Sequence, residues 1–308
     1  MIISCGEALI DMLPRETVGG EPAFAPYAGG SVFNTAIAIG RLGAPAGFFC
    51  GLSSDFLGDI LRDTLKRSNV DTSFCVTSDR PTTLAFVRLV NGQASYAFYD
   101  ENTAGRMLSE ADLPSLDSRV TALHFGAISL IPEPCGTAYE TLMAREAERR
   151  VIMLDPNIRP GFITDREKHL ARMRRMIAMA DIVKLSDEDI AWFGEGDDHD
   201  AIAADWLKRG PKLIIITRGA AGADAYTARG KISVPGVKVT VADTVGAGDT
   251  VNAGVLVSLY RQGLLTKDAV ANLTEDQVHA AVALGVRAAA VTVSRAGANP
   301  PWESEMVD

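Results

Sequence analysis

The chain has 308 residues, of which 47% are hydrophobic and 22% charged, and these ordinary values exclude a disordered protein. With 30 Lys and Arg against 39 Asp and Glu, the formal net charge is −9. This acidic balance argues against a nucleic-acid-binding protein, but it leaves room for a small anion held by local backbone N–H groups.

Short apolar runs alternate along the chain with longer amphipathic runs. We expect strands at Ile2–Cys5, Ala46–Cys50, Thr121–Phe125, Val151–Leu154, Ile182–Leu185, Leu213–Thr217 and Ala223–Tyr226. We expect helices at Val32–Leu42, Asp55–Ser68, Glu133–Arg150, Asp165–Ala180, Ala201–Arg209, Gly246–Gln262 and Glu275–Ala290. Strands separated by helices form βαβ units, so the pattern predicts an α/β fold: a doubly wound, mostly parallel sheet flanked by helices.

One region departs from this alternation. The segments Thr83–Val90 and Ala94–Asp100 alternate apolar and polar residues around Asn91-Gly92, which favours a type I′ β-hairpin. Together with the stretch near residues 12–28, this hairpin predicts a small second sheet. We therefore expect one α/β domain over residues 1–308, with a small lid formed by about residues 12–30 and 82–104.

The four cysteines are widely spaced and form no CxxC pair. Cys5, Cys50, Cys75 and Cys135 are expected to be reduced, mostly buried thiols of a cytoplasmic protein rather than disulfides or zinc ligands. The first residues enter a strand-like run without a basic segment, and no apolar run is long enough for a bilayer. Neither a secretory signal nor a membrane span is expected.

A glycine-rich turn, DTVGAGDT, occupies residues 243–250 and opens an apolar helix, after a run at 239–242 that resembles a strand. Small residues at Gly246, Ala247 and Gly248 would let backbone N–H groups converge on one anion at the positive end of the helix. Asp249 beside that point could accept a proton from an attacking hydroxyl. Taken alone, a turn of this type is more often an ordinary helix start in which Asp249 only favours the helix dipole.

Two further features carry polar groups toward a possible ligand. Gly29-Gly30 precedes a helix that carries Asn34 in its first turn, a pattern typical of a hinge or of close ligand approach, although a tight turn would look the same. Asp11 ends the apolar run of the first strand, where α/β sheets place ligand groups, and could accept from two sugar hydroxyls, although a lone aspartate at a strand end is more often simply solvated.

Asp11 within GEALID, the segment AGGSVFN and the segment DTVGAGD resemble, in this order and spacing, the PfkB carbohydrate kinase family with its ribokinase-like fold. The resemblance covers nearly the whole chain. The segments DPNIRP, VKLSDED, TRGAAG and FYDENTAGRML are similar to the bacterial fructokinase branch.

The resemblance implies catalytic roles near the glycine-rich turn. Asp249 would be the general base, and the amides of Gly246, Ala247 and Gly248 would form the anion hole for the transferred phosphoryl group. Arg159 would reach the substrate or the transferring phosphate through its planar guanidinium.

The resemblance also implies how a sugar is held. Asp11, Gly30, Asn34 and Asp249 would bind its hydroxyls, with Gly29 and Gly30 at the lid hinge.

ATP with Mg²⁺ is the implied phosphoryl donor. The implied nucleotide-side residues are Lys184, Ser186, Thr217, Gly219, Gly222, Gly246 and Gly248. Asp243 and the Val245 carbonyl correspond to a monovalent-cation site, possible for K⁺, found in part of the family. Ser186 and Asp189 stand where many members have an Asn-x-x-Glu segment that organises Mg²⁺, so a water-mediated contact through Asp189 is expected instead.

These implications predict an ATP-dependent sugar kinase, with D-fructose converted to fructose 6-phosphate. The alternatives are a 2-keto-3-deoxygluconate kinase, a ribokinase or nucleoside kinase, or a sugar sensor without catalysis. A carboxylate substrate would require a dedicated arginine, for which Arg88 and Arg106 are candidates. The exposed lid strands predict a homodimer that pairs through the lid.

Overall fold

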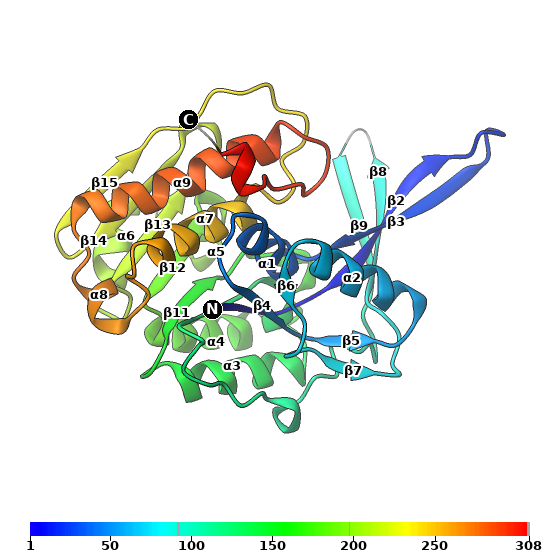
Figure 1. The fold of residues 1–308 in the computed structure, drawn as a ribbon, viewed down its shortest axis with the longest axis horizontal. Helices are drawn as coiled ribbons and strands as arrows, with labels where there is room; N and C mark the ends of the chain where they lie inside the picture. The colour runs from blue at the N-terminus through cyan, green and yellow to red at the C-terminus, as the bar shows by residue number, and fades with distance from the viewer. Residues whose placement is uncertain (91–92, 197, 307–308) are drawn as a thin grey trace.

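The computed structural model describes residues 1–90, 93–196 and 198–306. Its largest element is a nine-stranded sheet with the order β15-β14-β13-β12-β11-β10-β1-β4-β6 (Figure 1). These strands are β1 (Ile2–Cys5), β4 (Ala46–Phe49), β6 (Val70–Asp71), β10 (Ala122–Gly126), β11 (Val151–Asp155), β12 (Ile182–Ser186), β13 (Leu213–Thr217), β14 (Ala223–Thr227) and β15 (Gly230–Val234). Neighbours from β6 to β13 pair in parallel, and β14 and β15 pair antiparallel, which confirms the mostly parallel sheet.

Helices cover both faces of this sheet, which is why its strands are continuous apolar runs. In β1, Ile2 packs into the core on one face and Ile3 into the core on the other. The first face is covered by α1 (Ser31–Arg41), α2 (Phe56–Arg67), α7 (Ala247–Arg261), α8 (Lys267–Ala271) and α9 (Glu275–Val293). The second face is covered by α3 (Cys135–Glu146), α4 (Arg166–Met179), α5 (Asp187–Phe193) and α6 (His199–Trp206).

A second sheet projects from one end of the main sheet (Figure 1). Its order is β3-β2-β8-β9, formed by β2 (Leu9–Glu16), β3 (Pro22–Gly29), β8 (Leu84–Val90) and β9 (Gln93–Tyr99). The chain segments are thus those expected to form a lid, and β8 and β9 pair antiparallel as the hairpin pattern predicts. The turn Asn91-Gly92 lies outside the described residues. A short parallel pair, β5 (Gly51–Ser53) and β7 (Val76–Ser78), lies near the base of this sheet.

Two local expectations differ from the structure. Asp11 lies in β2 of the small sheet rather than at the end of the first strand, because the chain leaves the main sheet at residues 6–8. The run at 239–242 is a loop and not a strand, since Val239 and Val241 are exposed and pair with no strand among the described residues. Its alternation of apolar residues reflects the lining of a cavity described below.

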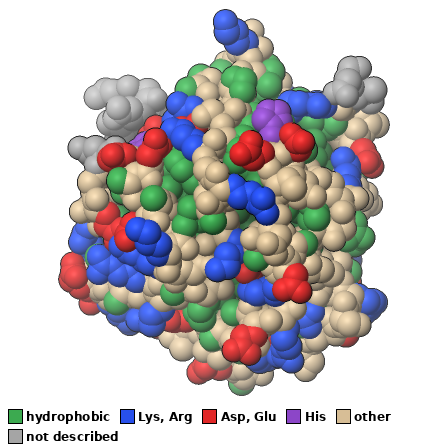
Figure 2. Space-filling model, turned by 90° about the vertical axis from the view of Figure 1, so that its left-hand side faces the viewer, with side chains coloured by type: hydrophobic (Ala, Val, Ile, Leu, Met, Phe, Trp, Pro, Cys, Tyr) green, Lys and Arg blue, Asp and Glu red, His purple; other side chains and the backbone are tan. Residues whose placement is uncertain are grey.

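The molecular surface carries mixed charges. On the face over β14, β15 and α9, basic and acidic side chains are interspersed (Figure 2). In the described part of the chain, no helix combines the length and the apolar character that crossing a membrane requires.

The strand ends gather polar residues at one edge. Glu7 follows β1, Asn157 and Arg159 follow β11, Lys184 lies near the end of β12, and Thr217 ends β13. Because the carboxyl ends of parallel strands meet at the same edge, these residues converge where open α/β sheets bind their ligands.

Candidate active site

Asp249 lies in the first turn of α7 and is buried. Ser31 Oγ donates a hydrogen bond of 2.5 Å to its Oδ1, and Asn34 Nδ2 donates one of 2.9 Å to its Oδ2. Ser31 Oγ in turn accepts from Asn157 Nδ2 at 2.7 Å. Both carboxylate oxygens of Asp249 are therefore oriented by donors from the start of α1, in a chain of contacts that reaches the loop after β11.

The environment of Asp249 raises the pKa of its carboxyl group towards neutral pH. Burial raises the pKa of Asp249 to about 6, although the hydrogen bonds from Ser31 and Asn34 and the charge of Lys184 act in the opposite direction. The carboxyl group is thus mostly ionised at neutral pH and is a stronger base than an exposed aspartate. Such a group is suited to accept a proton from a hydroxyl.

The helix start beside Asp249 is built from small residues. Gly246 caps α7 with a φ of 79°, a left-handed conformation that glycine adopts without steric cost. Gly246, Ala247 and Gly248 all line the cavity that contains Asp249, and the Ala247 amide donates to the Thr244 carbonyl at 3.3 Å. The positive end of the 15-residue helix α7 therefore points at the space next to the carboxylate.

A buried ammonium group lies under this helix start. A Cβ at Gly248 would lie 2.8 Å from Lys184 Nζ, so a side chain there would displace the ammonium group. Lys184 Nζ donates to Asp155 Oδ2 at 3.1 Å, and the same oxygen accepts from Asn252 Nδ2 at 2.7 Å. Burial alone would lower the pKa of Lys184, but the Asp155 carboxylate holds it above its ordinary value, so the lysine stays charged.

The cavity around Asp249, here called the acidic cavity, has a volume of about 350 Å³. Asp11, Gly30, Asn34 and Arg159 line it together with Asp249, so the structure brings these predicted residues to one site. Arg159 is exposed, and its Nη1 donates to the carbonyl of the neighbouring Ile158 at 3.0 Å.

Gly29 contributes to this site without lining the cavity. A Cβ at Gly29 would lie 2.2 Å from Asp11 Oδ2, so only glycine leaves the Asp11 carboxylate in its place. Burial raises the pKa of Asp11 to about 6. Gly30 has a φ of 110°, and a Cβ there would meet the Glu7 carbonyl at 2.9 Å.

Glu7 is a buried carboxyl group that the sequence analysis did not single out. Its Oε1 accepts from the Val32 amide and its Oε2 from the Ser129 amide, each at 3.3 Å. Burial raises the pKa of Glu7 to about 7 against these hydrogen bonds. Its place two residues after β1, at the ligand-binding edge, is the signal that could have revealed it. No such local signal marks Ser31, because the residue that it contacts, Asp249, is 218 positions away in the chain.

A second cavity, here called the apolar cavity, adjoins the first and has a volume of about 640 Å³. The predicted residues Thr217, Gly219 and Gly222 line it, and the exposed Val237, Val239 and Val241 supply apolar walls. Ala247 and Gly248 line both cavities. The two spaces therefore meet at the N-terminus of α7, beside Asp249.

Ser186 and Asp189 do not line either cavity. Ser186 caps α5, and its hydroxyl and amide both lie within 2.8 Å of Asp189 Oδ2. Asp189 Oδ1 accepts from the Ile158 amide at 2.7 Å. Both oxygens of Asp189 are thus occupied by protein donors, an arrangement that fits a positioning role for the loop before Arg159 better than direct metal ligation.

The loop before α7 is held in a similar way. Asp243 Oδ1 accepts from the Val245 amide at 3.0 Å and its Oδ2 from the Gly297 amide at 2.9 Å. Within residues 1–90, 93–196 and 198–306, no group of three His, Cys, Asp or Glu side chains is placed to hold a metal ion. A cation at Asp243 would therefore depend on backbone carbonyls such as that of Val245.

Comparison with known proteins identifies the family. The profile of the pfkB family carbohydrate kinases matches residues 1–305. The chain belongs to this family. The resemblance inferred from the glycine-rich motifs is confirmed, and this carbohydrate kinase transfers a phosphoryl group to a carbohydrate hydroxyl.

Its relatives include several fructokinases. The fructokinase of Rhizobium leguminosarum bv. trifolii is 64% identical over 275 residues, which cover 89% of this kinase and 84% of the relative. The crystal structure of a fructokinase with bound ATP from Xylella fastidiosa has a TM-score of 0.88 at 28% identity and covers 96% of this kinase and 93% of that chain. A double mutant of the Vibrio cholerae fructokinase, with fructose, ADP and potassium bound, has a TM-score of 0.83 at 25% identity and covers 96% and 93%.

Proposed function

We propose that this kinase is an ATP-dependent fructokinase that converts D-fructose to fructose 6-phosphate. The observation that carries the proposal is the position of Asp249, a buried carboxylate at the helix start where the acidic and apolar cavities meet. The fructokinase of Rhizobium leguminosarum, at 64% identity, supports fructose over the other sugars.

In the proposed reaction, Asp11, Gly30 and Asn34 bind the sugar in the acidic cavity and direct its hydroxyl at Asp249. The Asp249 carboxylate accepts the hydroxyl proton as the sugar oxygen forms a bond to the γ-phosphorus of ATP. The bond between that phosphorus and the β,γ-bridging oxygen breaks, and ADP leaves. Most of the rate enhancement comes from positioning and electrostatics, as in other phosphoryl transfers.

The negative charge of the transferring group is offset by fixed positive groups. We assign this role to the amides of Gly246 and Gly248, to the Ala247 amide once the phosphoryl group replaces its 3.3 Å bond to the Thr244 carbonyl, to Arg159, and to the buried ammonium of Lys184 near Gly248. Mg²⁺ bound with ATP would neutralise charge on the phosphate oxygens. Asp189 would reach it only through water, because protein donors occupy both of its carboxylate oxygens.

The adenosine part of ATP belongs, in this proposal, to the apolar cavity. Thr217, Gly219 and Gly222 line this cavity, and the exposed valines of the loop at 237–241 would cover the apolar surface of the adenosine. Lys184 then lies on the phosphate side, and Ser186, which lines neither cavity, would act there only through Asp189. K⁺ is proposed at the loop of Asp243 and Val245, where it would order the backbone before α7.

We further propose that residues 1–308 form one α/β domain, in which the small sheet closes over the acidic cavity as a lid. Asp11 belongs to β2 of this sheet and Phe98 to β9, and both line the cavity. Closure of the sheet would therefore place these side chains against the sugar and at the same time exclude water from the cavity. The half-exposed Phe24 of edge strand β3 and the exposed Tyr99 of edge strand β9 support a homodimer through this sheet.

The test is a coupled assay of ADP release with fructose, 2-keto-3-deoxygluconate, ribose and adenosine as acceptors. We expect fructose to give the highest kcat/KM, with phosphorylation at the 6-hydroxyl. Preference for another acceptor would overturn the choice of fructose and leave the kinase family intact. Sugar binding without ADP release would instead favour the sensor.

A further inference from the structure

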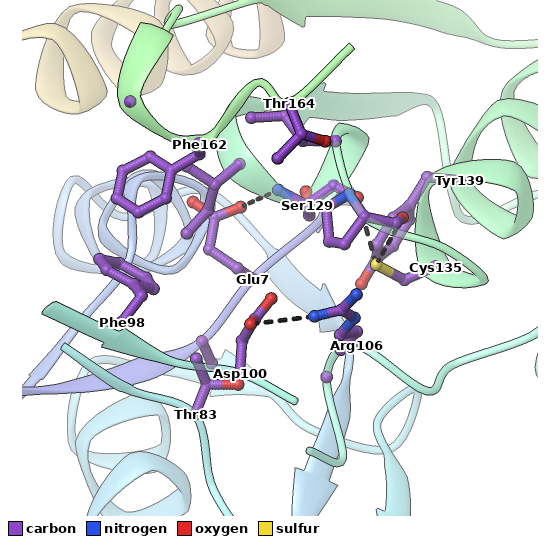
Figure 3. A pocket seen from close by; sticks show the side chains of 16 residues that line it. Glu7, Thr83, Phe98, Asp100, Arg106, Ser129, Cys135, Tyr139, Phe162 and Thr164 are labelled. Atoms are coloured by element: carbon purple, nitrogen blue, oxygen red, sulfur yellow. Dashed lines mark hydrogen bonds and ion pairs between the residues drawn. The ribbon is translucent and has the colours of Figure 1, made fainter. Parts of the chain in front are cut away.

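A third cavity, here called the side cavity, extends from the acidic cavity away from Asp249. It has a volume of about 330 Å³ and shares Glu7, Phe98, Ile128 and Phe162 with the acidic cavity. Phe98 and Phe162 pack edge to face with ring centroids 4.5 Å apart. Figure 3 shows this aromatic pair on one side of Glu7 and the side chains of Asp100 and Arg106 on the other. An acceptor that reaches beyond Glu7 would meet those two charged groups.

Asp100 and Arg106 form an ion pair in the side cavity. Arg106 Nη1 lies 3.1 Å from Asp100 Oδ1, and 34% of each side chain is exposed. The turn between them is tied by Thr103, whose Oγ1 donates to the Asp100 carbonyl at 2.9 Å and accepts from the Arg106 amide at 3.4 Å. The backbone therefore holds the two side chains together, and the pair does not depend on their attraction alone.

The ion pair sets the net charge that a sugar substrate meets in the side cavity. The described residues that line the acidic and side cavities include the acids Glu7, Asp11, Asp100 and Asp249 and the bases Arg106, Arg159 and Lys184. Lys184 is already paired with Asp155, and Arg106 with Asp100. The side chain of the other candidate, Arg88, lies outside the described residues. At the Arg106 end, a carboxylate would have to compete with Asp100 for the guanidinium.

We propose that Asp100 is a specificity-determining residue, which neutralises Arg106 and thereby makes the side cavity reject sugar acids in favour of uncharged sugars. This inference rests on the proposed function, since it assumes that the acceptor lies between Asp249 and the side cavity. The hydroxyl groups of an uncharged sugar can donate hydrogen bonds to Asp100 and accept them from Arg106 at the same time. A carboxylate can only accept, and it is repelled by the charge of Asp100.

The test compares fructose with 2-keto-3-deoxygluconate in the Asp100→Asn variant, which keeps the size of the side chain and removes its charge. We expect kcat/KM for the sugar acid, relative to that for fructose, to rise by about tenfold or more, mainly through a lower KM for the acid. Asp100→Glu should restore the discrimination of the wild type. Asp205→Asn, on α6 at a surface ion pair with Arg209, is the matched control and should leave the ratio unchanged.

The role of Arg106 is separated by the double variant Asp100→Asn/Arg106→Gln. If Asp100 acts by neutralising Arg106, the gain for the sugar acid disappears when the guanidinium is also removed. A gain that persists in the double variant, or no gain in folded Asp100→Asn, would overturn the inference. Competitive inhibition by the sugar acid provides a second readout, because it reports binding even if turnover of both acceptors falls.

The two proposals fail differently. A wild-type enzyme that prefers another uncharged sugar overturns the assignment of fructose but keeps the role of Asp100. A wild-type enzyme that prefers a sugar acid overturns both.

Discussion

Ser31 Oγ lies 2.5 Å from Oδ1 of Asp249, although the two residues are 218 positions apart in the chain. The hydroxyl donates to the carboxylate and so stabilises its charged form, and Asn157 orients the hydroxyl from the other side. Ser31 belongs to the segment that starts α1, directly after the glycine pair. The start of α1 is therefore coupled to the acidity of Asp249 through this hydrogen bond and through the one from Asn34 Nδ2.

The Ser31→Ala variant should shift the pH dependence of the reaction. Loss of the hydrogen bond removes a stabilisation of the charged carboxylate, so the pKa of Asp249 rises and the acid limb of the pH profile of kcat/KM moves to higher pH. The measurement is kcat/KM for the preferred sugar between pH 5 and pH 9. The matched control is Ser54→Ala, which removes a hydrogen bond from the Ser54 hydroxyl to Asp79 on the surface. Superimposable profiles for wild type and Ser31→Ala would show that the bond does not set the acidity.

The Asp249→Asn variant should lose most of its activity while remaining folded. Removing a general base costs on the order of 10²–10⁴ in rate, and an amide of nearly the same shape cannot take up the proton. The expected result is a lower kcat with little change in the KM for ATP, because Asp249 does not line the apolar cavity. Thermal unfolding checks the fold, and Asp205→Asn serves as a surface control. Turnover near that of the wild type would remove Asp249 from the mechanism.

The wild-type reaction should become slower below about pH 6. Burial raises the pKa of Asp249 to about 6, so at lower pH the base is increasingly protonated and inactive. Asp11 has a pKa raised by burial to about 6, and its protonation weakens its ability to accept sugar hydroxyls in the same range. Both groups act in the same direction, and the acid limb of kcat/KM should therefore be steeper than for one group. An acid limb centred near pH 4 would contradict the raised values.

The burial of Asp11 should also make the stability of the protein depend on pH. Activity should rise with pH in this range, whereas the contribution of Asp11 to stability should fall. The pKa of Asp11 is 3.8 when the side chain is fully exposed and about 6 in the folded protein, so between these pH values the folded state binds more protons than the unfolded state. The contribution of Asp11 to the free energy of unfolding therefore decreases as pH rises from about 4 to about 6. Asp11→Asn does not titrate, so its stability relative to the wild type should increase over this range. Denaturant unfolding at pH 4 and pH 7 measures the change, and a constant difference between the two proteins would refute it.

The parts of the fold that follow from local pattern could be predicted from the sequence. The apolar runs of the main sheet are buried on both faces, so they are continuous and easily recognised, and Asp249 could be singled out because its glycine-rich turn is local. Asp11 was predicted on the wrong strand, since nothing in GEALID indicates that the chain changes sheets at residues 6–8. The run at 239–242 was predicted as a strand because its valines alternate, whereas they line a cavity.

The contacts that complete the site could not be predicted, because they join distant segments. Ser31 reaches Asp249 only after α1 and α7 pack together, and Asn252 reaches Asp155 across 97 positions. The pKa of Glu7 depends on burial by residues from several elements, which one sequence does not reveal. Local composition thus singles out Asp249, and tertiary packing determines its acidity.

The Lys184→Met variant should be strongly destabilised. Lys184 and Asp155 form a buried ion pair with side chains 5% and 1% exposed, and removing one partner of such a pair costs about 3–5 kcal/mol because the other charge remains buried. The double variant Lys184→Met/Asp155→Asn should recover part of this loss, since no uncompensated charge remains. Both should have reduced kcat, because the positive charge next to Gly248 is absent in each. Denaturant unfolding and steady-state kinetics separate the two effects. Full activity of the double variant would exclude an electrostatic role for the ammonium group.

The Gly29→Ala variant should impair sugar binding specifically. The added Cβ would lie 2.2 Å from Asp11 Oδ2, far inside van der Waals contact, and the flexible end of the Asp11 side chain can move away more easily than the backbone. Displacement of this carboxylate removes acceptors for sugar hydroxyls, so the KM for the sugar should rise by about tenfold while the KM for ATP stays unchanged. Gly19→Ala, in the turn between β2 and β3, is the matched control, because its Cβ would have its nearest neighbour, Thr17 Oγ1, at 3.8 Å. Equal increases in both KM values would mean that Gly29 acts through the hinge of the small sheet and not through Asp11.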